Sequence, residues 1–509
     1  MMAGELPVFV LINVFEQLPP KDLAQCCLVC KQWRAAATSP LLWSSLPTSL
    51  DLHFVSPIQV TRVASVPYLS VCSQLDIIIA TPCSLDLSVV LTSVLTLFGP
   101  RIHRLTLSFN GLTDRLLRSI PQSAPNLTSL SVMFRSDILS YSLTSDISPN
   151  VFSDVLPFLP KLTHLSLRAD SLFSVSILQV FPVIVSCFQS TLQSLELTCG
   201  MYPSFLWSSL IPAESPSSSS QQSWFPCLSK LTLSSFPPEW ATCFAHVKEL
   251  QELHLEIGKL LSPLVKLSSL RTLHTLTLKE ITGLAPEDLS AFFSSSLSRL
   301  ECVSIKQSPF NGTVLFNMSK SSSCSTLHTL KLGGTAAAVA GEINTLKGLN
   351  KRTELHNSLR KLSISSMATS LDALTKAITS CVQLESLKLK KVELVGPQSE
   401  AIQFGQEWAY LPNLQGLHLN TVTFVASTIK VTSLFQRQSN IKKLQLSHLP
   451  AFNSSILALA TSLCSNLRHL KLTDSDTLFG NASTVQHVIS ICPNLLRFTV
   501  TPCPNVDFT

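Results

Sequence analysis

The sequence is short of charge and of glycine, and it lacks the motifs of the common enzyme classes. Charged residues make up only 13% of the 509 residues, and only 15 residues are glycine. Neither the GxGxxG nor the P-loop spacing occurs, and HExxH, GxSxG and metal-spaced clusters of His and Cys are also missing. The sequence therefore predicts no catalytic site, no metal and no cofactor, and it favours a binding function.

The sequence also shows no membrane-spanning segment and no secretory signal. The nearest approach to a spanning run, Leu87 to Phe98, is too short and contains serine and threonine. Glu5 stands where a signal peptide would have basic residues before an apolar core. We therefore expect a protein of the cytoplasm, the nucleus or both, without a membrane partner. The net charge of +6 is small for this length and indicates no nucleic-acid partner.

The cysteines are numerous but form no framework. There are 15, scattered along the chain, and Cys27-x-x-Cys30 has no matching pair further on. Free, buried thiols in a reducing compartment fit this pattern better than zinc or disulfides. At 509 residues and 45% hydrophobic content, the chain is also too long for one ordinary core, so several domains or a repeat array are expected.

The N-terminal stretch predicts three short amphipathic helices. Apolar residues recur every three to four positions from Leu11 to Leu18, and Pro19-Pro20 ends that helix. Asp22 is a suitable N-cap for a second helix, whose apolar face is broken near Cys30. Ser39-Pro40 starts the third. So small a module buries too little surface to be stable alone, so we expect it to pack against the rest of the chain or a partner.

This module, residues 1–46, resembles the F-box. The family landmarks follow in order: Leu6-Pro7, Val14-Phe15, Leu18-Pro19-Pro20, the run from Leu28 to Arg34, and Pro40-Leu41-Leu42-Trp43. A helical cap sealing the first repeat of a solenoid is the alternative interpretation. The resemblance implies docking onto the adaptor subunit of a cullin-RING (SCF-type) ubiquitin ligase. The residues assigned to adaptor binding are Leu6, Pro7, Leu11, Phe15, Leu18, Pro20, Leu23, Val29, Cys30, Trp33, Leu42 and Trp43.

From residue 101 onward one apolar pattern recurs fifteen times: apolar, two residues, apolar, one residue, apolar. Its first positions are 22 residues apart at the closest (Leu228 to Leu250) and 36 at the widest (Leu192 to Leu228). Cys72/Leu75/Ile77 is a weaker sixteenth copy. The fifteen copies begin at Ile102, Leu127, Leu162, Leu192, Leu228, Leu250, Leu273, Leu300, Leu327, Leu359, Leu384, Leu414, Ile441, Leu467 and Leu495.

The pattern resembles the leucine-rich repeat, and the reason is physical. The last two apolar positions are two residues apart on a strand, so both point inward while their neighbours point outward. Each strand returns through a roughly helical segment, and stacked repeats bury a continuous core. Helices are expected at Ser370 to Thr379, Ile456 to Ser462 and Val485 to Ile491.

Three cysteines recur at one position of the repeat, three residues before its first leucine. They are Cys381, Cys464 and Cys492, and they resemble the cysteine-containing subclass of the repeat. In that subclass the thiol packs as a small hydrophobic group, which we expect here.

The predicted fold is therefore α/β: a three-helix F-box, then a curved leucine-rich-repeat solenoid with a parallel concave sheet and convex helices. Residues 47–100 are interpreted as an irregular connecting and first-repeat region, with candidate strands at Leu50 to Leu52 and Leu75 to Ile79, and residues 101–509 as the solenoid. The low-complexity stretch Glu214 to Ser223 is expected to form a loop.

The outward strand positions of the C-terminal half carry charge of one sign. Of 21 such positions from Leu327 onward, seven are Lys or Arg and none is acidic, whereas the N-terminal half mixes both signs. A basic concave face attracts an acidic or phosphorylated partner, although a merely solvated face is the alternative. The substrate-binding candidates are Lys331, Lys361, Lys388, Lys390, Lys443, Lys471 and Arg497.

Together the resemblances imply a non-enzymatic substrate-recognition subunit of an SCF-type ubiquitin ligase, which binds a target protein through the repeats. Two alternatives are a non-degradative scaffold and a regulator of a partner protein, since ribonuclease inhibitors and some GTPase activators are also leucine-rich.

Overall fold

The computed structural model divides into two compact units, Met1–Pro237 and Pro238–Thr509. In the part of the chain that it describes, no helix has the length and apolarity needed to cross a membrane. The described residues are 6–18, 20–45, 48–51, 74–78, 92, 95–96, 99–109, 114–134, 150–169, 183–199, 225–234, 247–259, 270–282, 285–294, 299–308, 314–315, 317–318, 325–334, 346, 354–395, 402–403, 411–424, 429–430, 440–448, 466–473 and 490–501.

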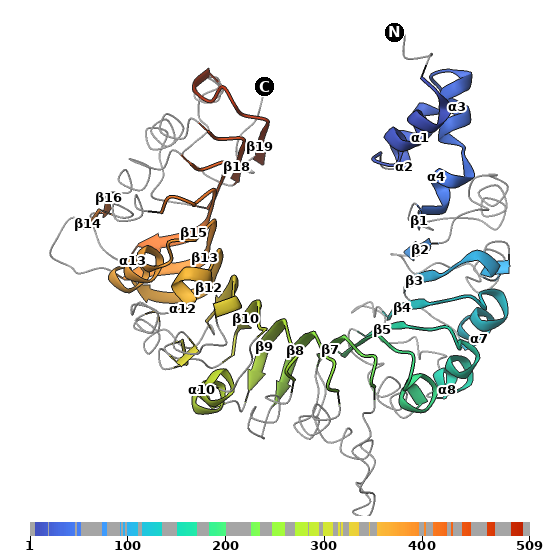
Figure 1. Cartoon of the computed structure of the whole chain (residues 1–509), viewed down its shortest axis with the longest axis horizontal. Helices are drawn as coiled ribbons and strands as arrows, with labels where there is room; N and C mark the ends of the chain where they lie inside the picture. The colour runs from blue at the N-terminus through green and yellow to red at the C-terminus, as the bar shows by residue number, and fades with distance from the viewer. Residues whose placement is uncertain are drawn as a thin grey trace, which may run out of the picture. The chain divides into compact units, whose positions relative to one another are not determined.

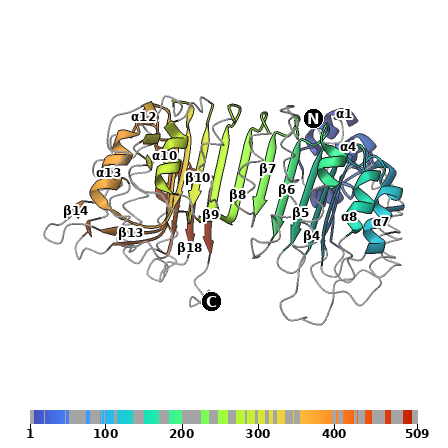
Figure 2. The same ribbon diagram turned by 90° about the horizontal axis from the view of Figure 1, so that it is seen from below.

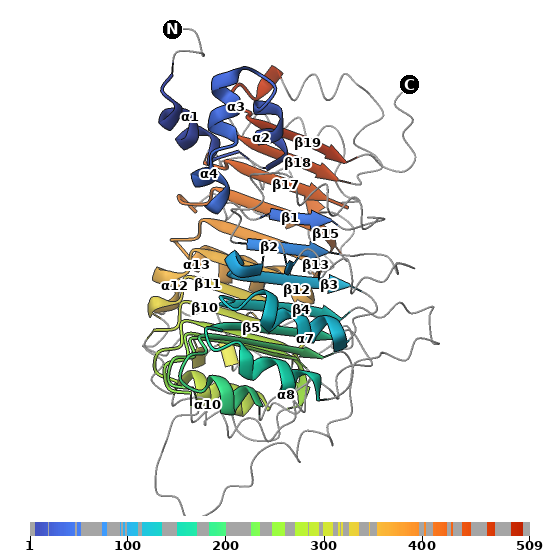
Figure 3. The same cartoon turned by 90° about the vertical axis from the view of Figure 1, so that its right-hand side faces the viewer.

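The chain begins with four short helices that share one core. They are α1 (Val8–Phe15), α2 (Pro20–Cys26), α3 (Lys31–Ala37) and α4 (Pro40–Ser45) (Figure 3). The rings of Phe15 and Trp33 meet edge to face with their centroids 5.2 Å apart, a geometry that stabilises aromatic pairs. The indole Nε1 of Trp43 donates to the Ala37 carbonyl at 2.5 Å. The buried core residues are Leu11, Phe15, Leu23, Cys26, Ala36, Ala37, Leu42 and Trp43.

The prediction of three helices is corrected to four, because the break near Cys30 separates two helices. Cys30 has an extended backbone (φ −157°, ψ 172°), and its Sγ accepts a hydrogen bond from the Trp33 amide at 3.4 Å, so it caps α3. Arg34 Nε donates to the Cys27 carbonyl at 3.0 Å and thereby ties the intervening turn to α3. Asp22 lies in the first turn of α2, where its charge favours the helix dipole, and not at the N-cap.

The first unit continues as an array of parallel strands that pair in chain order. Helices α7 (Asp114–Ser123) and α8 (Val151–Val155) run beside β3, β4 and β5 on one side of the array (Figure 1). The strands are β1 (Thr48–Asp51), β2 (Gln74–Ile78), β3 (Arg104–Phe109), β4 (Ser129–Phe134), β5 (His164–Ala169), β6 (Ser194–Cys199) and β7 (Lys230–Ser234).

The second unit holds a longer array of the same kind, again parallel and paired in chain order (Figure 2). Helices α10 (Pro286–Ser294), α12 (Glu354–Ser358) and α13 (Leu371–Ser380) cover one side of its strands (Figure 1). A separate two-stranded pair joins β14 (Ile402–Gln403) to β16 (Ile429–Lys430). The main strands are β8 (Glu252–Lys259), β9 (Thr275–Thr282), β10 (Cys302–Lys306), β11 (Thr329–Gly333), β12 (Lys361–Ser370), β13 (Ser386–Val395), β15 (Gly416–Phe424), β17 (Lys443–Ser447), β18 (His469–Thr473) and β19 (Arg497–Thr501).

The repeated leucines build the core by stacking in register. Leu362 of β12 aligns with Leu387 of β13, which aligns with Leu417 of β15, and all three are at most 1% exposed. Each such burial stabilises the fold by about 1.5–3 kcal/mol. Because one strand cannot cover its own apolar face, stability comes from the stack and not from the single repeat.

Several strands of the second unit contain one extra residue that the repeat pattern did not predict. Ser366, Lys391 and Thr421 have φ of 51°, 53° and 50° and lie at equivalent positions, one residue beyond the outward position that follows the second leucine. Glu280 has the same conformation, at φ 55°. This left-handed residue acts like a β-bulge, because it shifts the inward–outward alternation by one position.

The shift brings a further apolar residue inward. Ile281, Met367, Val392 and Val422 each follow a left-handed residue, and each is at most 4% exposed. In β10 the equivalent inward position is Ser308, whose hydroxyl accepts from the Ile281 amide and donates to the Lys306 carbonyl, both at 3.0 Å. The second unit therefore has a third row of inward residues along its strands, after the two rows of leucine. We call this row the third layer.

The repeat prediction is confirmed at every copy: all fifteen coincide with strands, and the weaker sixteenth is β2. The helix predicted at Ser370 to Thr379 is α13, shifted by one residue. Cys381 and Cys492 are buried free thiols, as expected for packing residues, and burial raises the pKa of Cys381 to about 12.

Other predictions fall outside the described residues. These are the loop at Glu214 to Ser223, the helix at Ile456 to Ser462, Cys464, and most of the helix at Val485 to Ile491. The boundaries proposed at residues 46 and 100 stay predictions.

Candidate docking and recognition surfaces

The structure sorts the twelve adaptor-binding candidates into three groups by burial. Pro7, Val29 and Cys30 are exposed, whereas the side chain of Pro20 lies outside the described set. Leu6, Leu18 and Trp33 are half-buried against the helical core. The remaining five are buried core residues that maintain the module and present no surface: Leu11, Phe15, Leu23, Leu42 and Trp43.

Apart from Val29, sequence reasoning missed the large apolar side chains that the four helices leave uncovered. Phe9 on α1 is 66% exposed, Leu28 and Val29 in the turn before α3 are 73% and 60% exposed, and Leu41 on α4 is 74% exposed. Large exposed hydrophobic residues on so small a module mark an interaction site. The signal for Phe9 was available, because it lies two residues before Leu11 and therefore on a different face of α1.

All seven predicted basic residues lie on the exposed face of the second unit. Each flanks an inward apolar residue on its strand and is exposed, so its side chain lies on the outward face. Among the described residues, none of the seven has an ion-pair partner. One further cation belongs with them: Lys306 on β10 stands at the equivalent outward position. It was missed because the predicted set began one repeat later.

Four of these lysines surround a group of small side chains, and we call the four the lysine frame. In one row across the sheet, Ser363 of β12 lies between Lys331 of β11 and Lys388 of β13. In the next row, Gly333 of β11 and Ser365 of β12 lie between Lys306 and Lys390. The frame is therefore Lys306, Lys331, Lys388 and Lys390, and its floor is Gly333, Ser363 and Ser365.

Glycine is required in the floor for steric reasons. A Cβ atom on Gly333 would lie 2.9 Å from the Ser365 Oγ and 3.2 Å from the Lys306 Cγ. The first distance is shorter than real Cβ contacts, so any larger residue would displace the hydroxyl or the lysine stem. The absence of a side chain lets the Lys306 stem cross β11 close to the sheet.

The pKa of Lys306 reflects the charges of the lysines around it. Partial burial, together with Lys331, Lys279, Lys388 and Lys390, lowers the pKa of Lys306. Lys279 is offset by Glu256, whose Oε2 lies 3.5 Å from its Nζ. Among the described residues, none of the four frame lysines has an ion-pair partner of this kind.

His418 of β15 lies next to the lysine frame. It follows Lys388 in the row across the sheet. Burial, with additional repulsion from Lys388 and Lys443, lowers the pKa of His418, against a hydrogen bond that the ring donates to Gln445 and that acts the other way. The imidazole is therefore held neutral at pH 7 beside the lysines.

A polar depression of about 530 Å³ adjoins this region where β11, β12 and β13 begin. Two of its basic side chains lie beside carboxylates: His328 Nε2 is 3.3 Å from Glu301 Oε2, and Arg360 Nη1 is 3.5 Å from Glu385 Oε1. Lys361 lines it too and has no ion-pair partner among the described residues.

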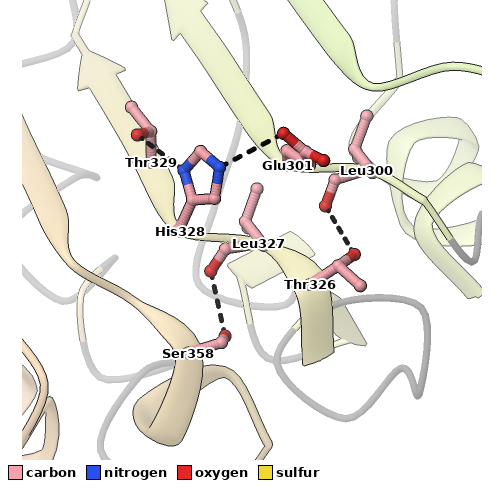
Figure 4. A network of polar contacts seen from close by, with 7 residues as sticks. All are labelled: Leu300, Glu301, Thr326, Leu327, His328, Thr329 and Ser358. Carbon is pink, nitrogen blue, oxygen red and sulfur yellow. Dashed lines mark hydrogen bonds and ion pairs between the residues drawn. The ribbon is translucent and has the colours of Figure 1, made fainter.

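Figure 4 shows the contacts around His328 in this depression. The His328 Nδ1 is 3.2 Å from Thr329 Oγ1. The hydroxyls of Thr326 and Ser358 donate to the carbonyls of Leu300 and Leu327, each at 2.9 Å. These bonds tie the turns of three successive repeats together. We therefore interpret the network as structural and not as a reactive site.

Comparisons with known proteins agree with this architecture at the N-terminus. Residues 3–47 match the F-box-like family model. No curated protein matches the chain.

Two solved structures also show some similarity to this chain. A leucine-rich-repeat protein of Leptospira interrogans aligns over 88% of this chain and 99% of its own, with 16% identity and a TM-score of 0.41. Internalin C2 of Listeria monocytogenes aligns over 41% of this chain and 74% of its own, with 20% identity and a TM-score of 0.25.

The stacked parallel strands, their aligned leucines and the helices on one side define a leucine-rich-repeat fold. An F-box-like helical module therefore precedes repeats with a leucine-rich-repeat fold.

Proposed function

We propose that this chain is the substrate-recognition subunit of an SCF-type ubiquitin ligase, in which the helical module binds the adaptor and the repeats bind a target protein. The observation that supports this most is the F-box-like module at residues 3–47, because F-box modules typically dock onto the adaptor of cullin-RING ligases. Neither the F-box nor the leucine-rich-repeat family is generally catalytic. The chain would act by holding its target at high effective concentration near the ubiquitin-conjugating enzyme.

The adaptor surface that we propose combines Leu6 and Pro7 with the exposed apolar residues Phe9, Leu28 and Val29. The half-buried Leu6 packs against the helical core, and its carbonyl accepts a hydrogen bond from Gln32 Nε2 at 2.5 Å. The five core candidates would support binding only indirectly, by keeping the helices in place.

The test is a pull-down of adaptor and cullin by the full-length chain. Leu28→Ser with Val29→Ser should abolish adaptor capture without unfolding the module, because both side chains are exposed. The Leu6→Ala, Pro7→Ala double variant should also lose capture. A matched control is Val382→Ser, another exposed apolar residue (44%), in the second unit. Circular dichroism must show an unchanged helical signal, particularly for Trp33→Ala, which removes the edge-to-face partner of Phe15.

Adaptor capture that persists in both double variants would contradict the docking assignment. Capture of the adaptor without the cullin would instead favour a non-degradative scaffold. For the target, we propose the basic outward face of the second unit, formed by Lys331, Lys361, Lys388, Lys390, Lys443, Lys471 and Arg497.

A further inference from the structure

We infer that the lysine frame is a binding site for a phosphorylated serine or threonine in a target protein. The inference rests on the proposed function, because it names the chemistry of the segment that a substrate receptor would recognise. It narrows the basic face from seven dispersed cations to one site with a defined floor.

The first step of the argument is geometric. Every lysine of the frame is the register neighbour of a floor residue: Lys306 of Gly333, Lys331 and Lys388 of Ser363, and Lys390 of Ser365. Neighbouring strands lie about 4.8 Å apart. A lysine side chain is longer than this spacing, so four ammonium groups can reach one group placed on the floor.

The second step concerns what the floor leaves open. Ser363 and Ser365 have short side chains and are half-buried, whereas Gly333 is buried with the Lys306 stem close to it, so the accessible part of the floor lies at the two serines. Ser363 is half-exposed, which leaves its hydroxyl accessible. The Ser365 hydroxyl donates its hydrogen to the Leu332 carbonyl at 3.3 Å. Its oxygen therefore remains available as a hydrogen-bond acceptor, beside the positively charged lysines.

The third step is the choice of anion. Four like charges around one floor favour a compact dianion with several acceptor oxygens over carboxylates spaced along a chain. All four cations are lysine and none is arginine. Lysine binds phosphate as a point charge from any direction, so four lysines can share one phosphate without the fixed fork geometry of arginine. A phosphoserine or phosphothreonine carries about −1.5 to −2 charges at pH 7 and meets both conditions.

The fourth step is that the site would otherwise be unfavourable. Burial, with repulsion from Lys331, Lys279, Lys388 and Lys390 adding to it, lowers the pKa of Lys306, and no frame lysine has an ion-pair partner among the described residues. The arrangement is relieved by an anion on the floor. Lys361 lies two residues before Ser363 on the same face of β12. It adds a fifth cation, which would bind an acidic residue next to the phosphorylated one.

The experiment uses the purified full-length chain and two fluorescein-labelled peptide pools. One pool has a fixed central phosphothreonine with randomised flanks, and the matched pool has threonine there. We expect the phosphorylated pool to bind at least tenfold more tightly by fluorescence anisotropy. Affinity should also fall as salt is raised from 50 to 300 mM.

Two variants locate the site on the sheet. Lys331→Gln with Lys388→Gln should weaken binding of the phosphorylated pool at least tenfold. Lys443→Gln with Lys471→Gln is the matched comparison: it removes the same charge from the same face, outside the frame, and should weaken binding several-fold less than the first pair. Ser363→Glu keeps all four lysines but places a carboxylate between two of them, and it should weaken binding as much as the first pair. Melting curves must show that each variant is folded.

Several results would overturn the inference. Equal losses from the two glutamine pairs would show a diffuse basic face. Equal affinity for a pool with glutamate in place of phosphothreonine would show that the site binds any negatively charged side chain and does not require phosphate. Tighter binding to a single-stranded RNA or to phosphatidylserine vesicles would assign the frame to another class of partner. None of these results depends on adaptor capture, so failure here leaves the proposed ligase role testable, and loss of adaptor capture leaves the phosphate site testable.

Discussion

The two arrays of strands treat charge on their outward faces in different ways. In the first, Arg168 Nη2 lies 2.6 Å from Glu196 Oε1, and Ser166 donates to the other carboxylate oxygen at 2.8 Å. In the second, the lysines of the frame have serine or glycine as the register neighbours that form its floor. A cation beside a carboxylate is already satisfied within the fold, whereas a cation beside serine remains available to a ligand.

The arrays also differ in the backbone. Left-handed residues occur at one position of seven repeats in the second unit, from Ile257 to His448. The described strands of the first unit contain none. For a residue other than glycine this conformation costs about 1–2 kcal/mol, and the third inward layer offsets that cost. The same leucine pattern therefore supports two strand geometries.

The largest expected effect comes from removing the third layer. Ile281→Ala should lower the free energy of unfolding of the second unit by about 2–5 kcal/mol, because the side chain is 0% exposed and its loss leaves a cavity. Urea unfolding followed by circular dichroism measures this. Thr423→Ala, on an exposed strand position, is the control and should stay within about 0.5 kcal/mol. Similar losses in both variants would mean that the layer carries no special stability.

The next effect tests the left-handed conformation itself. Ser366→Val should destabilise the second unit by about 1–2 kcal/mol, because a β-branched residue is strongly disfavoured at positive φ. Ser366→Gly should change stability by no more than about 1 kcal/mol. Ser363→Val, three residues earlier where φ is not positive, provides the comparison. If valine is tolerated equally at both positions, the backbone there is not held left-handed in solution.

A smaller effect is expected from opening the ion pair of the first unit. Glu196→Gln should cost at most about 1 kcal/mol, because the Arg168 and Glu196 side chains are partly exposed and solvent screens them. A double-mutant cycle with Arg168→Gln measures the coupling. A coupling energy well above 1 kcal/mol would show that the Arg168–Glu196 pair contributes substantially to the stability of the first unit, contrary to this prediction.

The smallest effect is in the dependence of stability on pH. Burial, with Lys388 and Lys443 adding to it, lowers the pKa of His418 below its ordinary 6.5. The unfolded chain therefore takes up a proton first as pH falls through 6.5, and stability declines until the folded pKa is passed. His418→Gln should reduce the loss of stability between pH 7.5 and 5.5. An unchanged pH profile would show that His418 titrates normally.

His164 supplies the equivalent test in the first unit. Burial is the larger cause, and Arg104 the second, of its lowered pKa. His164→Gln should reduce the pH dependence in the same direction, so the two histidines show whether the arrays differ in their response to acid.

The sequence by itself determined where the strands lie. The spacing of leucines two residues apart recurs often enough that every copy became a strand, because alternate side chains of a strand must share one face and stacking is the only way to bury it. The positions of Lys331, Lys388 and Lys390 outside the leucines followed from the same alternation. The F-box-like module was also readable, since its landmarks are local in sequence.

Only the tertiary structure decided which residues meet. The frame joins Lys306 to Lys390 across four strands, and their proximity depends on strand register that the sequence pattern does not encode. The left-handed residues had a faint signal, an apolar residue three positions after the second leucine, but the required φ becomes visible only when neighbouring strands pair. In the helical module, burial separated core residues such as Phe15 from exposed ones such as Leu28. Periodicity could not do so, because apolar residues occupy more than one face of those short helices.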